Sequence, residues 1–293
     1  MHADHMTFDP RKLMAVGLLT FGVVLVYWQV LRKLVYDWAN DGNYSHGFLI
    51  VPIALYFVWE RRAKLQQITP HPSLFGLFVF AGGILVLLAG LLGAELFLTR
   101  ISLLGVLIGI ILFLLGWAHL RALAFPLAFL LLMIPLPAII FNQIAFPLQL
   151  LASRAGEFAI SSADIPVLRE GNVLVLAHTS LEVAEACSGI RSLISLLTLG
   201  IVFGYFTDPR GWVRTVIALS TVPVAIISNG ARVAGTGIAA HRWGPAVAEG
   251  FFHEFSGWVI FVVAFVLMFA LQQLIVRLLP AATDTSSAAA TAA

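Results

Sequence analysis

The chain has 293 residues, of which 60% are hydrophobic and 11% are charged, and its mean hydropathy is +0.96. A soluble globular domain carries about 25% charged residues, so this composition indicates a membrane protein without a sizeable soluble domain. The single cysteine excludes an intramolecular disulfide and a cysteine-rich metal site. The net charge of +2 comes from scattered Lys and Arg residues, so nucleic acid is not expected as a partner.

Eight apolar runs follow one another along the chain, and we expect each to form a helix that crosses the lipid bilayer. They cover residues 13–31, 47–59, 74–93, 101–117, 122–141, 189–206, 213–228 and 254–276. The fifth run contains Pro126, Pro135 and Pro137, and we expect it to be kinked or broken. The predicted fold is an all-α polytopic membrane protein, with one domain over residues 1–280 and a disordered tail over 281–293.

Short basic loops predict the orientation of these helices, because Lys and Arg favour the cytoplasmic side of a membrane. The clusters 60–64 and 208–214 are both short and basic, and eight spans place them on the same side. We therefore expect the N-terminus and the C-terminus to lie in the cytoplasm.

The longest segment between predicted spans, about 142–186, then falls on the outer side. Polar residues interrupt the apolar pattern over 144–160, which is typical of an amphipathic helix at the membrane interface. Residues 167–176 predict a short β-hairpin, and 181–183 alternate like a further strand. This small outer cap leads directly into Cys187.

Three polar clusters lie at the outer ends of the last three predicted spans. They cover residues 185–192, 228–233 and 253–258. Because the topology places all three on one membrane face, a thiol, a guanidinium and an imidazole are expected at one surface. That combination indicates acyl transfer by a cysteine nucleophile.

Cys187 is the predicted nucleophile, because free backbone N–H groups at the start of a helix favour a thiolate. His253 is predicted to take the thiol proton and later to protonate the departing amine. Arg232 is predicted to stabilise the oxyanion with a charge that does not depend on pH. The backbone amide of Ser188 is a further candidate for holding that oxyanion.

Other polar residues are expected to bind substrate or to support the catalytic groups. These are Glu185, Ser188, Arg191, Asn229, His46 and Glu254. Asn229 precedes Arg232 by three residues, and Arg191 follows Cys187 by one helical turn. The histidines lack the spacing of a zinc site and the glycines match no nucleotide-binding motif, so neither a metal nor a cofactor is expected.

The three clusters resemble, in order and spacing, the motifs of the exosortase/archaeosortase family of polytopic membrane transpeptidases. The matching residues are Glu185-Ala-Cys187-Ser188-Gly189-Ile-Arg191-Ser192, Asn229-Gly-Ala-Arg232-Val233 and His253-Glu-Phe-Ser-Gly257-Trp258, with a weaker match from Tyr44 to Pro52. The similarity extends from about Tyr44 to about Val276. It implies a catalytic set of Cys187, Arg232 and His253.

The resemblance also implies a substrate class and a compartment. Substrates would be exported proteins with a C-terminal sorting signal (PEP-CTERM), made of a Pro-Glu-Pro-like motif, a transmembrane helix and a basic cluster. The enzyme would cleave at the motif and transfer the protein to an unidentified acceptor nucleophile, often in bacteria that make exopolysaccharide. It would lie in the bacterial inner membrane with its active site at the periplasmic face.

Three alternatives stay open at this point. A transporter or assembly factor for polysaccharide export would use the intramembrane charges to line a path. A second enzymatic mechanism would use Ser188 as the nucleophile beside His253. With water as the acceptor, the transpeptidase would be a protease.

Overall fold

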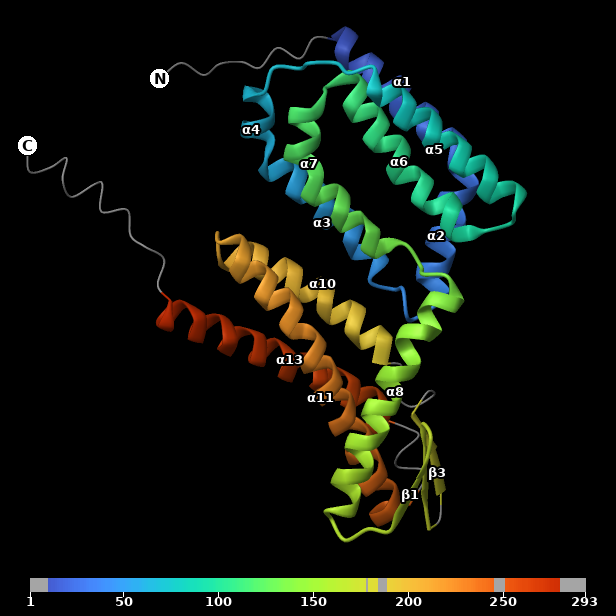
Figure 1. Cartoon of the computed structure of the whole chain (residues 1–293), viewed down its shortest axis with the longest axis vertical. Helices are drawn as coiled ribbons and strands as arrows, with labels where there is room; N and C mark the ends of the chain where they lie inside the picture. The colour runs from blue at the N-terminus through green and yellow to red at the C-terminus, as the bar shows by residue number, and fades with distance from the viewer. Residues whose placement is uncertain (1–9, 178, 184–188, 245–250, 280–293) are drawn as a thin grey trace, which may run out of the picture. The chain divides into compact units, whose positions relative to one another are not determined.

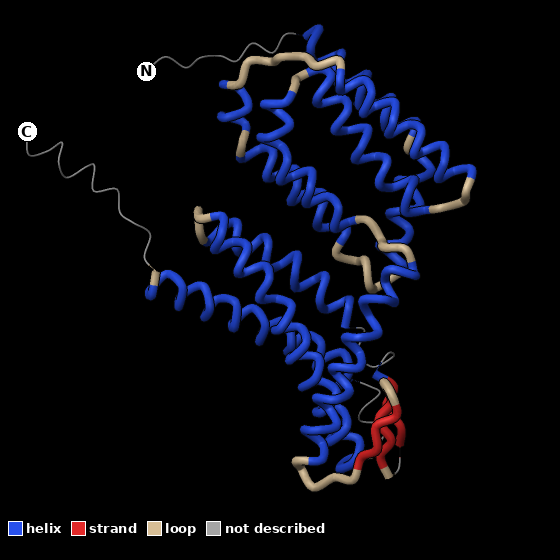
Figure 2. Tube along the Cα trace, in the orientation of Figure 1, coloured by secondary structure: helices blue, strands red, loops and turns tan. Residues whose placement is uncertain are grey.

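The computed structural model of the chain describes residues 10–177, 179–183, 189–244 and 251–279. These residues form helices and one small β-sheet (Figures 1 and 2), which confirms the predicted helical membrane fold. Their contacts define two compact units, Met1–Pro137 and Ala138–Ala293. The single domain expected over 1–280 stays a prediction, and the tail expected over 281–293 lies outside the described residues.

In the described part of the first unit, all regular secondary structure is helical. Its elements are α1 (Pro10–Val26), α2 (Trp28–Asn40), α3 (Gly47–Glu60), α4 (Arg62–Gln67), α5 (Phe75–Leu92), α6 (Leu96–Leu114), α7 (Trp117–Phe129) and the 3-10 helix η1 (Leu130–Met133). The first predicted span is not one straight helix, because α1 and α2 meet at Tyr27 with a bend of 69°. Tyr27 is fully buried and its hydroxyl lies 3.0 Å from that of Ser102 on α6.

The hairpin of α5 and α6 is packed backbone against backbone by glycines. A Cβ at Gly76 would lie 2.2 Å from the backbone nitrogen of Phe113, and one at Gly109 would lie 2.4 Å from that of Phe80. Any larger side chain would separate the two helices, which is how small residues allow membrane helices to associate closely.

The second unit combines helices with a small sheet. Its described elements are α8 (Ala138–Ser161), β1 (Val167–Glu170), β2 (Val173–Leu176), β3 (Thr179–Glu182), α10 (Gly189–Thr207), α11 (Gly211–Trp243) and α13 (Phe251–Leu278). The strands pair antiparallel in the order β1-β2-β3, with Val167 opposite Leu176 and Leu176 opposite Thr179. The predicted hairpin and further strand are therefore confirmed.

One face of this sheet is buried against helices. Leu174 and Leu176 alternate with partly exposed residues along β2, as expected for a strand with one covered face. They pack with Ile160 of α8 and Val233 of α11 in one apolar cluster. The sheet is thereby fixed to the second half of α11.

Several helices are long and apolar enough to cross a membrane. By length and composition, four described segments qualify: α5, α6, α11 and residues Phe261–Leu278 of α13. The count rises to six if two bent helix pairs, Met14–Val26 with Trp28–Asn40 and Trp117–Met133 with Ala138–Ser161, each form one span. Two shorter apolar helices are Gly47–Glu60 and Arg191–Thr207. The chain is thus a multi-pass membrane protein, and the count of eight spans stays a prediction.

One helix break agrees with the prediction, and one helix end differs from it. The helical path is interrupted at residues 134–137, where Pro135 and Pro137 lie, and α8 then begins at Ala138. Helix α11 does not end at residue 228 but continues to Trp243. Asn229 and Arg232 consequently lie within a long helix rather than beyond its end.

Candidate functional site

The structure describes only part of the predicted catalytic set. Cys187, Glu185 and Ser188 lie outside the described residues, and α10 begins at Gly189, two residues after Cys187. The backbone of His253 and Glu254 belongs to the first turn of α13. Helices α10, α11 and α13 carry or follow the predicted catalytic residues, and their packing defines the candidate site.

Helices α10 and α11 pack antiparallel in a register that several contacts fix. Leu196 and Ala225 share one apolar cluster, and a Cβ at Gly200 would lie 2.4 Å from Cγ2 of Thr221. Leu193 and Asn229 line the same small pocket, so the register holds toward the start of α10. In this antiparallel register, each step toward the start of α10 corresponds to one step toward the end of α11. Extending the pairs Gly200/Thr221 and Leu196/Ala225 in this way places Gly189 opposite Arg232.

Helices α11 and α13 are also antiparallel. Val213 and Ile217 at the start of α11 pack with Ile275 near the end of α13. Further along, Ala225 packs with Ala264. Extending the pair Ala225/Ala264 residue by residue places Arg232 opposite residue 257 of α13. His253 precedes residue 257 by four positions, which is about 6 Å along the axis of α13.

Arg232 lies on the helix face that makes these contacts. Ala225, Asn229 and Arg232 follow one another at spacings of four and three residues, which keeps them on one side of α11. Ala225 packs against α10 and α13 in the shared cluster. Asn229 is buried and Arg232 is half-buried. The polar end of this face therefore continues an apolar face that is packed against both neighbouring helices.

The adjacent face of α11 packs closely on α8. A Cβ at Gly230 would lie 2.8 Å from Cβ of Ala155, and one at Gly156 would lie 2.5 Å from Cγ1 of Val233. Small residues on both helices bring their backbones together at this point. This packing fixes α11 one residue away from Asn229.

The opposite end of α10 and α11 is held by charges. The carboxylate of Asp208 accepts hydrogen bonds from Arg210, including one of 2.7 Å from Nη2, and the carbonyl of Asp208 accepts one of 2.6 Å from Arg214. The Arg210 guanidinium also donates to the carbonyl of Leu279 after α13. The hydrogen bonds from Arg210 hold the pKa of Asp208 below its ordinary value.

Two further predicted residues have different surroundings. Arg191 is exposed near the start of α10. His46 belongs to the first unit, is buried, and places Nε2 3.2 Å from the carbonyl oxygen of Leu132. Trp38 donates to the next carbonyl, that of Met133, at 3.0 Å. His46 thus helps to cap the end of η1, and its predicted place in the active site stays a prediction.

One buried ion pair in the first unit was not predicted from the sequence. Asp37 of α2 accepts hydrogen bonds from Arg100 of α6 and, at 2.6 Å, from Lys33. Only 3% of the Arg100 side chain is exposed. An arginine in the apolar run of α6 is a signal that such a pair exists, since a charge in a membrane helix needs a partner.

Comparison with known proteins places the chain in a family. The family model for the transmembrane exosortase matches residues 38–270, a stretch that contains all three polar clusters. Among curated proteins and among solved structures, no match was found. Since the family match covers well over half of its length, the chain belongs to the transmembrane exosortase family.

Proposed function

We propose that the chain is a membrane-embedded cysteine transpeptidase in which Cys187, Arg232 and His253 carry out the chemistry. One observation carries the proposal: the register of α10, α11 and α13 puts Gly189 opposite Arg232 and the first turn of α13 about one turn away. Cys187 precedes Gly189 by two residues, which span at most about 7 Å of chain. This arrangement supports a shared site for the three groups.

The reaction begins when the Cys187 thiolate attacks the scissile carbonyl carbon of the substrate. A carbon–sulfur bond forms, and the carbonyl oxygen becomes an oxyanion beside the Arg232 guanidinium. His253, which took the thiol proton, returns it to the departing amine as the carbon–nitrogen bond breaks. The C-terminal tail leaves, and the substrate remains bound to Cys187 as a thioester.

An acceptor nucleophile resolves the thioester in the second half of the reaction. It attacks the same carbonyl carbon and loses its proton to His253. The carbon–sulfur bond then breaks, and His253 returns the proton to the Cys187 sulfur. Arg232 can stabilise the oxyanion in both halves of the reaction, because its charge is permanent. Since Arg232 is half-buried, its partial removal from water strengthens the electrostatic effect on the oxyanion. Asn229, buried one turn earlier, is proposed to hold Arg232 in position.

The proposed substrates are exported proteins with a short C-terminal motif, a transmembrane helix and a basic cluster. A substrate helix that lies beside α10, α11 and α13 in the bilayer would deliver its motif to the helix ends in a restricted orientation, which accelerates a reaction by orders of magnitude. We place the site at the periplasmic face of the inner membrane, with both termini in the cytoplasm. The proposal includes Glu185, Ser188, Arg191, His46 and Glu254 as groups that bind substrate or support catalysis.

The deciding experiment co-expresses the full chain with a tagged substrate that carries such a signal. Cys187→Ala should leave the substrate with its tail, which a blot detects as the larger form. Processing at the wild-type level, with equal amounts of enzyme, would exclude the cysteine mechanism and favour a role in polysaccharide export.

The guanidinium geometry has a separate test. Arg232→Lys preserves the charge but removes the planar fork, so processing should fall by at least about tenfold. Arg242→Lys is the matched control, because Arg242 is exposed on the same helix. Equal activity in the two variants would remove Arg232 from the catalytic set.

Mass spectrometry of the trapped acyl-enzyme identifies the nucleophile. We expect the substrate fragment on Cys187 and, in a Ser188→Ala variant, no change in the site of attachment. A fragment attached to Ser188 would establish the serine mechanism instead.

A further inference from the structure

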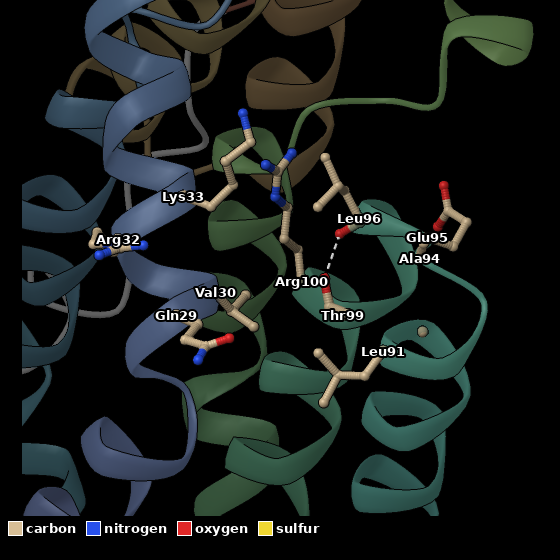
Figure 3. A pocket seen from close by; sticks show the side chains of 11 residues that line it. Gln29, Val30, Arg32, Lys33, Leu91, Ala94, Glu95, Leu96, Thr99 and Arg100 are labelled. Carbon is tan, nitrogen blue, oxygen red and sulfur yellow. Dashed lines mark hydrogen bonds between the residues drawn. The ribbon is translucent and has the colours of Figure 1, made fainter.

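A second polar region lies in the first unit, where a cavity of about 330 Å³ opens between α2 and the turn that joins α5 to α6. Figure 3 shows its lining side chains. Val30, Leu91 and Leu96 form an apolar part, and Lys33 and Arg100 a cationic part, with their side chains extending in the same direction from the two helices.

Positive charge exceeds negative charge around this cavity. Arg32, Lys33 and Arg100 line it, and the nearby acids are Glu95 and Asp37. The Glu95 carboxylate accepts the backbone N–H of Leu98 at 2.8 Å, where it caps α6. The Asp37 carboxylate pairs with both Lys33 and Arg100, so its single negative charge is shared between two positive charges.

The guanidinium of Arg100 has an unused donor. Its side chain is 3% exposed, and no described residue accepts a hydrogen bond from its Nε. A buried donor without a partner costs free energy that an added acceptor would recover. A planar guanidinium beside an ammonium group matches the oxygen atoms of a phosphate.

The position of Arg100 along its helix suggests the carrier of that phosphate. Arg100 lies four residues after Leu96, the first residue of α6, and therefore about 6 Å into the helix. A 19-residue helix is about as long as the hydrocarbon core is thick, so this depth is close to the headgroup region. The apolar lining beside the cations suits the glycerol and acyl part of a lipid.

We propose that this cavity binds the phosphate group of an anionic membrane lipid, with Arg100 and Lys33 as the phosphate ligands and Arg32 at its rim. The site involves no group of the proposed catalytic set. A Cys187→Ala variant should therefore bind the lipid as the wild type does, whatever its effect on processing.

Native mass spectrometry of the full chain in detergent tests the proposal. Phosphatidylglycerol should be retained in preference to phosphatidylcholine with the same acyl chains. The double variant Arg32→Gln/Lys33→Gln should weaken phosphatidylglycerol binding by roughly thirtyfold, since two cations are removed. The matched control is Arg62→Gln/Lys64→Gln, which removes two cations from exposed positions outside the cavity lining and should bind as the wild type does.

The remaining outcomes separate lipid binding from a purely structural ion pair and from a small-anion site. Asp37→Asn/Arg100→Gln removes the buried charges together and should abolish the preference for phosphatidylglycerol. Destabilisation with an unchanged lipid preference would overturn the proposal, as would equal retention of both lipids by the wild type. Displacement of phosphatidylglycerol by inorganic phosphate at similar concentration would identify a small-anion site and exclude the lipid.

Discussion

The two units place their polar residues in different settings. In the first unit, Asp37 on α2 and Arg100 on α6 are joined to each other, and the pair connects helices that are far apart in sequence. In the second unit, Asn229 and Arg232 lie on a helix face whose other residues make apolar contacts. Close packing of Gly230 and Val233 against α8 fixes the position of α11 there.

This difference teaches how a membrane protein can separate stability from chemistry. A buried charge that is neutralised by a second helix holds the fold together, and its removal leaves the partner without compensation. Apolar and glycine packing around α11 instead fixes the position of the backbone that carries Arg232. Changes in the first unit should therefore act on stability, and changes at Arg232 on turnover.

The largest effect on stability is expected from Asp37→Ala. It leaves Arg100 buried without a carboxylate and should lower the free energy of unfolding by about 3 kcal/mol. Thermal unfolding of the purified protein in detergent measures this change. Processing per folded molecule should remain close to that of the wild type, in contrast with Arg232→Lys.

The double variant Asp37→Asn/Arg100→Gln is the control for that prediction. It removes both charges, so most of the lost stability should return. If the double variant is as unstable as Asp37→Ala, the ion pair is not the source of the effect.

An intermediate effect is expected from Gly230→Ala in the second unit. The added methyl group would meet Cβ of Ala155 at 2.8 Å, and because that atom is fixed to the backbone, α8 and α11 must separate. The cost should be about 1 to 3 kcal/mol, again measured by thermal unfolding. Turnover should also fall, because Asn229 and Arg232 move with α11.

Gly235→Ala is the matched control on the same helix. A Cβ at Gly235 has nothing within 4 Å, so this variant should be neutral or more stable by up to about 1 kcal/mol. Equal destabilisation by the two substitutions would show that helix propensity, not packing against α8, governs the result.

The smallest effect is expected from protonation of Asp208. Since Arg210 lowers the pKa of this carboxyl in the folded protein, the charged form stabilises the fold above the ordinary value of about 3.9. That contribution is lost as the pH falls through the lowered pKa. The unfolding temperature of the wild type should therefore decline more steeply than that of Asp208→Asn as the pH falls below about 5. Parallel curves for the two proteins would contradict this role for Asp208.

The second unit contains both elements that the sequence predicted and one helix end that it did not. Alternation of apolar residues predicted the strands at 167–176 and 181–183, because a strand with one buried face leaves that pattern. Prolines predicted the interruption before α8. The predicted end of α11 at residue 228 was wrong. Asn229 and Gly230 have low helix propensity, but packing against α8 and the sheet stabilises the helix as far as Trp243.

The sequence by itself determined the membrane class, the small sheet and the polar clusters, because hydrophobicity and periodicity are local properties of a chain. It also contains the stretch 38–270 that matches the family model. Only the tertiary structure decided that Arg232 shares a packed face with Ala225, that Asp37 pairs with Arg100, and that a cationic cavity lies beside this pair. These depend on the register between helices, which is set by side-chain packing between segments distant in sequence and leaves no local pattern.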